Sequence, residues 1–213
     1  MRHGTERPTI FLATGNRGKV WEFGRLLGGS LDIRPMPDTI VLPEETGRTF
    51  AENARAKAEW VFAALEGAEA VLADDSGLEV EALDGRPGVQ SARYAGVDAT
   101  DEANVTKLLQ DLARCSDRRA RFVCRLCLIL PGPGADQEGP EVIEVEGRSS
   151  GRIMDAPQGT GGFGYDPVFL PEGWAITLAQ ASPEEKDQVS HRGAAARALL
   201  DVLRDRRLVG HAS

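Results

Sequence analysis

Apolar positions follow two different spacings along this chain, and the two alternate. Short, nearly continuous apolar runs are typical of buried strands. Such runs predict strands at residues 9–14, 31–36, 71–73, 121–130, 141–147, 151–154 and 167–170, and an alternating run at residues 78–83 fits a further strand. Apolar residues three or four positions apart predict helices instead. They occur over residues 18–27, 49–65, 101–113 and 191–206, with Thr100 as a suitable N-cap for the third helix.

The order of these elements indicates the fold class. Strands and helices alternate in the first half, whereas strands follow one another directly in the second half. This pattern favours an α/β (mixed α+β) protein built on a mixed sheet. The Pro- and Gly-rich residues 131–140 lie between two strand-like runs and predict an exposed hairpin connection. With no internal repeat, we expect residues 1–213 to form one domain, of which residues 1–8 are a polar N-terminal extension.

Composition narrows the possible functions. The net charge of −8 argues against binding to nucleic acid, which requires a basic surface. No apolar run approaches the ~20 residues of a membrane helix. The first residues lack the apolar segment of a secretory signal, so the expected location is cytoplasmic. The three cysteines do not suggest a disulfide framework, and Cys124 and Cys127 fall inside an apolar run where burial is expected.

A polar loop between the first strand and the first helix is a candidate phosphate site. It consists of Thr14, Gly15, Asn16, Arg17, Gly18 and Lys19. Glycines allow a ligand to approach the backbone, the amides at a helix N-terminus favour anions, and the lysine supplies a cation. The spacing differs from that of a Walker loop, and a purely structural turn is the alternative interpretation.

Acidic residues follow the strand at residues 71–73 and precede the second helix. Asp74 and Asp75 would reach the open edge of the sheet if the chain turned there, and a carboxylate at such an edge can bind Mg²⁺ or accept a proton. The alternative is an Asp-Ser-Gly turn. Glu44 and Glu45 precede the helix that carries Lys57, where they would also suit the helix dipole.

The second half carries a glycine-rich loop at residues 159–167. Phe163 and Tyr165 offer aromatic faces for a base, and Asp166 offers an acceptor. Lys186 precedes His191 and Arg192, which stand at the predicted start of the last helix, where an anion or a purine oxygen would be favoured. A structural glycine-rich turn and a packed histidine are the alternatives.

Together these segments resemble the non-canonical purine nucleotide pyrophosphatases, also called inosine/xanthosine triphosphate pyrophosphatases. The resemblance extends from residue 10 to residue 203. Its matching segments are TGNRGK at 14–19, EETGRTFAENARAKA at 44–58, ADDSGLEVEAL at 73–83, GRPGVQSARYAG at 85–96, GTGGFGYDPVF at 159–169 and EEKDQVSHRGAAARALL at 184–200. The departures are residues 1–8 and the insert at residues 131–140.

The resemblance implies a long mixed sheet flanked by helices, with two lobes, a nucleotide cleft between them and a homodimeric assembly. It also implies Mg²⁺ as cofactor and a role for each motif residue. Residues 14–19 would hold the triphosphate, Glu45 and Asp75 the Mg²⁺, and Asp75 would also activate water. Lys57 would neutralise the phosphates. The remaining substrate residues would be Ser76, Phe163, Gly164, Tyr165, Asp166, Lys186, His191 and Arg192.

The implied activity is hydrolysis of ITP, dITP and XTP to the monophosphate and pyrophosphate. Phosphoanhydride cleavage needs positioned cations, a metal and a positioned water, which agrees with the residues above. One alternative is a pyrophosphatase for canonical or modified pyrimidine triphosphates, against which the FGYD and SHR segments argue. The other is a nucleotide-binding regulator without turnover, against which the retained Glu45, Lys57, Asp74 and Asp75 argue.

Overall fold

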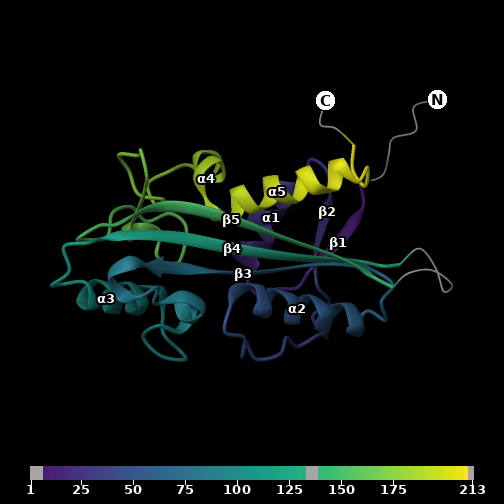
Figure 1. The fold of residues 1–213 in the computed structure, drawn as a ribbon, viewed down its shortest axis with the longest axis horizontal. Helices are drawn as coiled ribbons and strands as arrows, with labels where there is room; N and C mark the ends of the chain where they lie inside the picture. The colour runs from purple at the N-terminus through teal and green to yellow at the C-terminus, as the bar shows by residue number, and fades with distance from the viewer. Residues whose placement is uncertain (1–6, 133–138, 211–213) are drawn as a thin grey trace. The chain divides into compact units, whose positions relative to one another are not determined.

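Six strands form one mixed sheet in the computed structural model, which describes residues 7–132 and 139–210. The strand order is β2-β1-β3-β4-β5-β6 (Figure 1). β1 runs parallel to both β2 and β3, and β5 runs antiparallel to β6. The strands are β1 (Thr9–Leu12), β2 (Asp32–Pro35), β3 (Ala70–Val80), β4 (Arg119–Leu130), β5 (Glu141–Ile153) and β6 (Phe169–Pro171).

The helices begin at polar caps that the sequence supplies. They are α1 (Arg17–Leu27), α2 (Phe50–Ala64), α3 (Asp101–Asp111), α4 (Pro183–Val189) and α5 (His191–Asp205). Asn16, Thr49 and Thr100 cap the first three by accepting hydrogen bonds from free backbone amides of the first turn, which confirms the predicted cap at Thr100. Three short 3₁₀ turns complete the elements, at Glu81–Leu83, Gly88–Arg93 and Asp166–Val168.

Two predictions of separate strands were wrong. We expected a strand at residues 71–73 that ends at Asp74 and Asp75, and a separate strand at residues 78–83. Instead β3 continues to Val80 with both aspartates inside it, and Glu81–Leu83 form a 3₁₀ turn. Likewise residues 141–147 and 151–154 belong to one strand, β5. The acidic residues that resembled a turn are buried partners of lysines from neighbouring helices, so the strand does not need to end there.

α4 was not predicted, although its start signal is present in the sequence. Ser182 and Glu185 form a capping box, in which each side chain accepts from the other's backbone N–H, and Pro183 occupies the first helical position. The helix is only seven residues long, so it offers too few apolar repeats for periodicity to reveal it.

The chain divides into two compact units. Unit 1 comprises Met1–Asp75, Arg125–Glu146 and Ala195–Ser213; unit 2 comprises Ser76–Cys124 and Gly147–Ala194. The division therefore falls within β3, β4, β5 and α5. The relative placement of the units, and with it the expected single domain with a cleft, stays a prediction.

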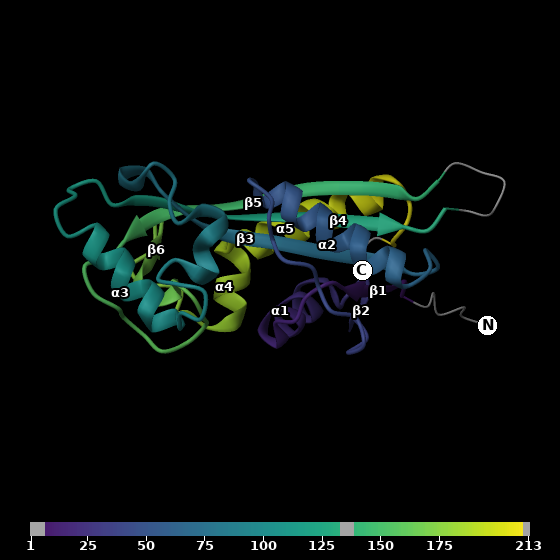
Figure 2. The same cartoon turned by 90° about the horizontal axis from the view of Figure 1, so that it is seen from below.

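Unit 1 has a core of small and branched apolar side chains between α2 and the strands. Ala54, Ala58 and Val61 of α2 pack against Val71 and Ala73 of β3. Figure 1 shows α2 on one side of the strands and α5 on the other, and Figure 2 shows α1 beside β1 and β2. Alanines on the inner face of α2 allow this helix to approach the sheet closely, which places its polar side chains near β3.

Unit 2 has a core of its own. Leu108 and Leu112 at the end of α3 pack with Leu78 and Val80 of β3 and with Phe169 of β6. Phe122 of β4 adds an aromatic contact with Phe169 at 4.7 Å between ring centroids. The core of unit 2 thus joins α3 to strands β3, β4 and β6, and Tyr165 of the glycine-rich loop packs into it.

The observed architecture confirms the predicted class, a mixed sheet flanked by helices. Cys124 and Cys127 are buried in β4, as expected, and neither they nor Cys115 form disulfides. None of the helices within residues 7–132 and 139–210 is long and apolar enough to cross a membrane. Residues 1–6 of the expected extension, and 133–138 of the expected hairpin connection, lie outside the described residues.

Candidate active site

The predicted phosphate site, residues 14–19, consists of the turn after β1 and the first three residues of α1, and residues 15–18 are exposed. The Asn16 side chain accepts from the amides of Gly18 at 2.8 Å and Lys19 at 3.3 Å, so it caps α1. The Asn16 amide donates to Thr14 Oγ1 at 3.1 Å. A Cβ placed on Gly15 would have no atom within 4 Å other than those of its chain neighbours, so the space beside this glycine is open. The loop is therefore a folded, accessible turn at a helix N-terminus, the kind of structure that accepts phosphate.

Lys19, in the first turn of α1, binds Asp74. Its Nζ is 2.8 Å from Asp74 Oδ2 and 3.0 Å from Oδ1. Asp74 is completely buried, whereas Lys19 retains some exposure. The aspartate therefore fixes the lysine amine beside the phosphate loop, and this contact gives Asp74 a positioning role that the sequence left open.

Glu45 and Asp75 meet at one lysine. Lys57 Nζ, on α2, lies 2.5 Å from Glu45 Oε1 and 3.6 Å from Asp75 Oδ1. Adjacent strand residues point to opposite faces of a sheet, so Asp74 reaches α1 while Asp75 reaches α2. Two carboxylates from distant parts of the sequence are thereby gathered around one buried ammonium group.

Burial raises the pKa of Asp75 from 3.8 to about 6, with the charge of Glu45 acting in the same direction and Lys57 opposing it. Burial by itself lowers the pKa of Lys57, but the surrounding carboxylates outweigh burial and raise it, so Lys57 stays protonated. A carboxylate with a pKa just below neutrality is suited to accept a proton from water at physiological pH. Asp75 therefore has the properties of a general base.

The same residues suit Mg²⁺. Its preferred ligands are oxygens, and it commonly uses one or two carboxylates together with water and substrate phosphates. Glu45 and Asp75 supply two converging carboxylates, and a cavity of about 180 Å³ lies beside Glu45 and Lys57. Across the described part of the chain, no group of three or more His, Cys, Asp and Glu side chains is placed to hold a metal ion. The two carboxylates fit a Mg²⁺ ion whose other ligands are water and substrate phosphate oxygens.

In unit 2 the glycine-rich loop folds onto Asp166. The amide of Phe163 donates to Asp166 Oδ2 at 3.0 Å, and Lys186 Nζ lies 2.7 Å from the same oxygen. Burial raises the pKa of Asp166, against the opposing effects of Lys186 and Arg192. A Cβ at Gly162 would overlap Asp166 Oδ2, and its φ of 72° is left-handed, so this position requires glycine.

Two cationic side chains lie over the Phe163 ring. Lys186 Nζ lies 4.9 Å and Arg192 Cζ 4.8 Å from the ring centroid, within the range of cation–π attraction. Lys186 comes from α4 and Arg192 from the first turn of α5. The loop, α4 and α5 thus bring an aromatic ring and hydrogen-bond donors together, the groups that recognise a purine carbonyl.

Tyr165 does not occupy the position we expected. Instead of offering its ring to a base, it is 3% exposed and packed in the core of unit 2. Its hydroxyl donates to the backbone carbonyl of Ser91 at 2.8 Å, and burial raises its pKa. Tyr165 therefore anchors the loop, which leaves Phe163 as its partly exposed aromatic ring.

The remaining predicted residues lie in unit 2 as well. His191 is buried, and its ring stacks on Phe122 with centroids 4.6 Å apart. Ser76 is partly exposed and follows Asp75 directly on β3. Gly164 donates its amide to Asp101 Oδ2 at 2.6 Å, which ties the loop to the start of α3. The residues predicted to bind phosphate and metal accordingly lie in unit 1, and those predicted to bind the base lie in unit 2.

Comparison with known proteins places this arrangement in a family. The sequence profile of the Ham1 family matches residues 10–202. The chain belongs to the Ham1 family. Among solved structures, the Ham1 protein of Staphylococcus aureus is 41% identical and has a TM-score of 0.79, with 93% of this chain and 99% of that chain covered. A HAM1 protein from Coxiella burnetii is 39% identical, with a TM-score of 0.76 and coverage of 93% and 99%.

Ham1 relatives of similar length carry an enzymatic name. A dITP/XTP pyrophosphatase of Methylacidiphilum infernorum is 42% identical over 95% of this chain and 97% of its own length. A dITP/XTP pyrophosphatase of Escherichia coli is 46% identical over 92% of this chain and 98% of its own length. The similarity therefore spans both units.

Sequence reasoning missed residues that hold the Ham1 motifs in place. Asn53 of α2 donates a hydrogen bond to Asp75. Ser91 accepts two hydrogen bonds, one from the Tyr165 hydroxyl at its backbone carbonyl and one from the Leu78 amide of β3 at its Oγ, at 2.9 Å. Asn53 stands four residues before Lys57, a spacing that puts both on one helix face and could have indicated a shared role. Ser91 lies in a matched segment to which no role had been assigned.

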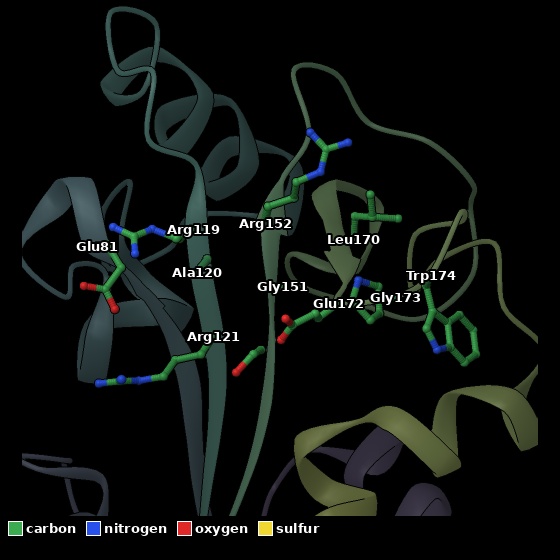
Figure 3. Close-up of a pocket in the computed structure, with 12 residues that line it drawn as sticks. Glu81, Arg119, Ala120, Arg121, Gly151, Arg152, Leu170, Glu172, Gly173 and Trp174 are labelled. Atoms are coloured by element: carbon green, nitrogen blue, oxygen red, sulfur yellow. The ribbon is translucent and has the colours of Figure 1, made fainter.

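A separate cavity of about 520 Å³ lies over β4, β5 and β6 in unit 2 (Figure 3). Arginines contribute to its lining, but Arg119 pairs with Asp117 at 2.7 Å and Arg121 with Glu79 at 2.6 Å. None of the residues predicted to bind metal or substrate lines this cavity. It is therefore distinct from the candidate active site.

Proposed function

We propose that this Ham1 protein hydrolyses non-canonical purine nucleoside triphosphates, namely ITP, dITP and XTP, to the monophosphate and pyrophosphate. The observation that carries the proposal is the convergence of Glu45 and Asp75 on the buried amine of Lys57. This is a charge arrangement suited to a metal–phosphate substrate. The dITP/XTP pyrophosphatase name of relatives that match almost the whole chain supports the same reaction.

In this proposal the residues of unit 1 act on the phosphate chain. The loop at residues 14–19 and Lys19 bind phosphate oxygens, and Lys57 neutralises negative charge that grows during cleavage. Asp75 accepts the proton of the attacking water. Glu45 and Asp75 would hold Mg²⁺, which, when bound, would polarise a phosphoryl oxygen of the substrate.

The residues of unit 2 select the base. Phe163 supplies the ring for stacking, and Arg192 donates a hydrogen bond to the 6-keto oxygen of hypoxanthine or xanthine. Adenine carries an amino group at that position. This amino group and the Arg192 guanidinium are both hydrogen-bond donors and cannot pair, so ATP is disfavoured. Lys186 and Asp166 fix the loop that presents Phe163.

We further propose that the protein works as a cytoplasmic homodimer that removes damaged nucleotides from the pool. A net charge of −8 is consistent with a small-molecule substrate rather than a polynucleotide. Gel filtration with light scattering would test the dimer, for which a monomer at micromolar concentration would be the contradicting result.

The experiment is a substrate panel with separate detection of pyrophosphate and orthophosphate. ITP, dITP, XTP, GTP, ATP and dUTP are each incubated with and without Mg²⁺. We expect Mg²⁺-dependent pyrophosphate from ITP, dITP and XTP and little from ATP. Preferential turnover of dUTP would instead support a pyrimidine enzyme, and binding without turnover would support a regulator.

A further inference from the structure

Asn53 connects two parts of unit 1 that carry the proposed metal ligands. It is 2% exposed, on α2. Its Oδ1 accepts from the Gly47 amide at 2.8 Å, and its Nδ2 donates to Asp75 Oδ2 at 3.0 Å. Gly47 lies two residues after Glu45, so one amide side chain joins the Glu45 loop to Asp75.

The loop is shaped to admit this side chain. A Cβ at Gly47 would overlap Asn53 Oδ1 and lie 2.9 Å from the Cβ of Glu52. Glu52 also accepts from the Arg48 amide at 2.7 Å, one residue further along the loop. Glycine at position 47 is therefore required by close approach, and the loop is fastened to the first turns of α2 through its backbone.

Asn53 and Lys57 contact different oxygens of the Asp75 carboxylate. They stand four residues apart on α2 and so project from the same face. Asn53 donates to Oδ2, whereas Lys57 faces Oδ1 at 3.6 Å and also binds Glu45. One helix face thus sets the positions of both carboxylates, and the neutral amide does so without adding charge.

We propose that Asn53 is a positioning residue that locks the Glu45 loop to Asp75, so that both carboxylates are arranged for a divalent cation before it binds. This inference rests on the proposed function for the identity of the two metal ligands. Groups that orient metal ligands through hydrogen bonds commonly contribute 10–100-fold to metal affinity or activity.

The test measures cation binding directly. Mn²⁺, used as a paramagnetic substitute for Mg²⁺, is titrated into the full-length protein, and free Mn²⁺ is followed by electron paramagnetic resonance. We expect Asn53→Ala to weaken Mn²⁺ binding by about tenfold or more. In the same variant, the Mg²⁺ concentration needed for half-maximal pyrophosphate release should rise by a similar factor. The fall in kcat at saturating Mg²⁺ should be smaller than this factor.

Asn104 provides a matched control. It is also 2% exposed on a helix, accepting from the Ala95 amide at 2.8 Å and donating to the Ala92 carbonyl at 3.1 Å. Asn104→Ala likewise removes two side-chain hydrogen bonds, but from unit 2, away from the proposed metal ligands. We expect it to lower the melting temperature while Mn²⁺ affinity stays within twofold of wild type.

Gly47→Ala disturbs the same contact between the Glu45 loop and Asn53, but from the loop side. It tests the inference even if Asn53→Ala does not fold. It should weaken Mn²⁺ binding as well, because its Cβ displaces the loop. In a double-mutant cycle, Gly47→Ala should cost less in the Asn53→Ala background, where the overlapping amide is gone.

Unchanged Mn²⁺ affinity in both single variants would overturn the inference, as would equal losses in Asn53→Ala and Asn104→Ala or strictly additive effects in the cycle. Absence of Mn²⁺ binding to the wild type would overturn it too. Failure of the proposed function is a different result, namely no pyrophosphate from any purine triphosphate despite normal Mn²⁺ binding.

Discussion

Replacing Asp75 with asparagine should stabilise the metal-free protein while removing its activity. Burial raises the pKa of Asp75 from 3.8 to about 6, which means that the folded state disfavours the ionised form. One pKa unit corresponds to about 1.4 kcal/mol, so this shift costs about 3 kcal/mol of stability at pH 7. Asparagine has the same size, still accepts from Asn53, and carries no charge. Asp75→Asn should therefore raise the free energy of unfolding by up to about 3 kcal/mol.

The pH dependence identifies the source of this gain. A carboxyl group whose pKa is raised on folding contributes its full stability below the unfolded pKa and loses it as pH rises through the folded value. For Asp75 this window runs from 3.8 to about 6. All other titrating groups are shared by the two proteins. The difference between variant and wild type should be small at pH 4 and complete by pH 7.

The assay is urea unfolding with a chelator present, at several pH values, together with pyrophosphate release from ITP in Mg²⁺. For a domain of this size, 1 kcal/mol corresponds to about 2–4 °C in Tm, so the melting temperature at pH 7 should rise by about 6–12 °C. Lower stability of Asp75→Asn at pH 7, or a gain that is independent of pH, would refute the electrostatic reasoning. Full activity would refute the role of Asp75 as base.

Three further changes test other parts of the site. Lys19→Met should destabilise the fold by about 3 kcal/mol in urea, because it removes the lysine from a fully buried Asp74, and Asp74→Asn should restore stability to it without restoring activity. Phe163→Ala should raise the KM for ITP by about tenfold or more through lost stacking, measured by initial rates. Tyr165→Phe should cost about 1–2 kcal/mol in urea, since the buried Ser91 carbonyl loses its donor, and should change KM less than Phe163→Ala. Equal effects of the two loop variants on KM would contradict the separation of their roles.

The elements that the sequence predicted well are those with strong local signals. α1, α2, α3 and α5 each have a long apolar repeat and, for the first three, a polar cap that the structure uses. β1 and β4 have continuous apolar runs. In each case one short stretch of chain contains all the information that specifies the element.

The errors occurred where tertiary contacts override the local pattern. Asp74 and Asp75 have the composition of a turn, yet lysines on α1 and α2 compensate their burial within a strand. Tyr165 and Phe163 look equivalent in sequence, but only Tyr165 has a carbonyl partner deep in unit 2. Asn53 gave only one signal, its spacing of four residues from Lys57, because the role of a single asparagine in a helix depends on its neighbours in space.

The central claim is tested most directly by incubating the purified protein with ITP and with ATP, each with and without Mg²⁺, and assaying pyrophosphate and orthophosphate separately. The account predicts pyrophosphate from ITP, only in the presence of Mg²⁺, and little product from ATP. Orthophosphate as the direct product would place the attack at the terminal phosphate and contradict the proposed reaction. Equal turnover of ATP would contradict the selection of the base by its 6-keto oxygen.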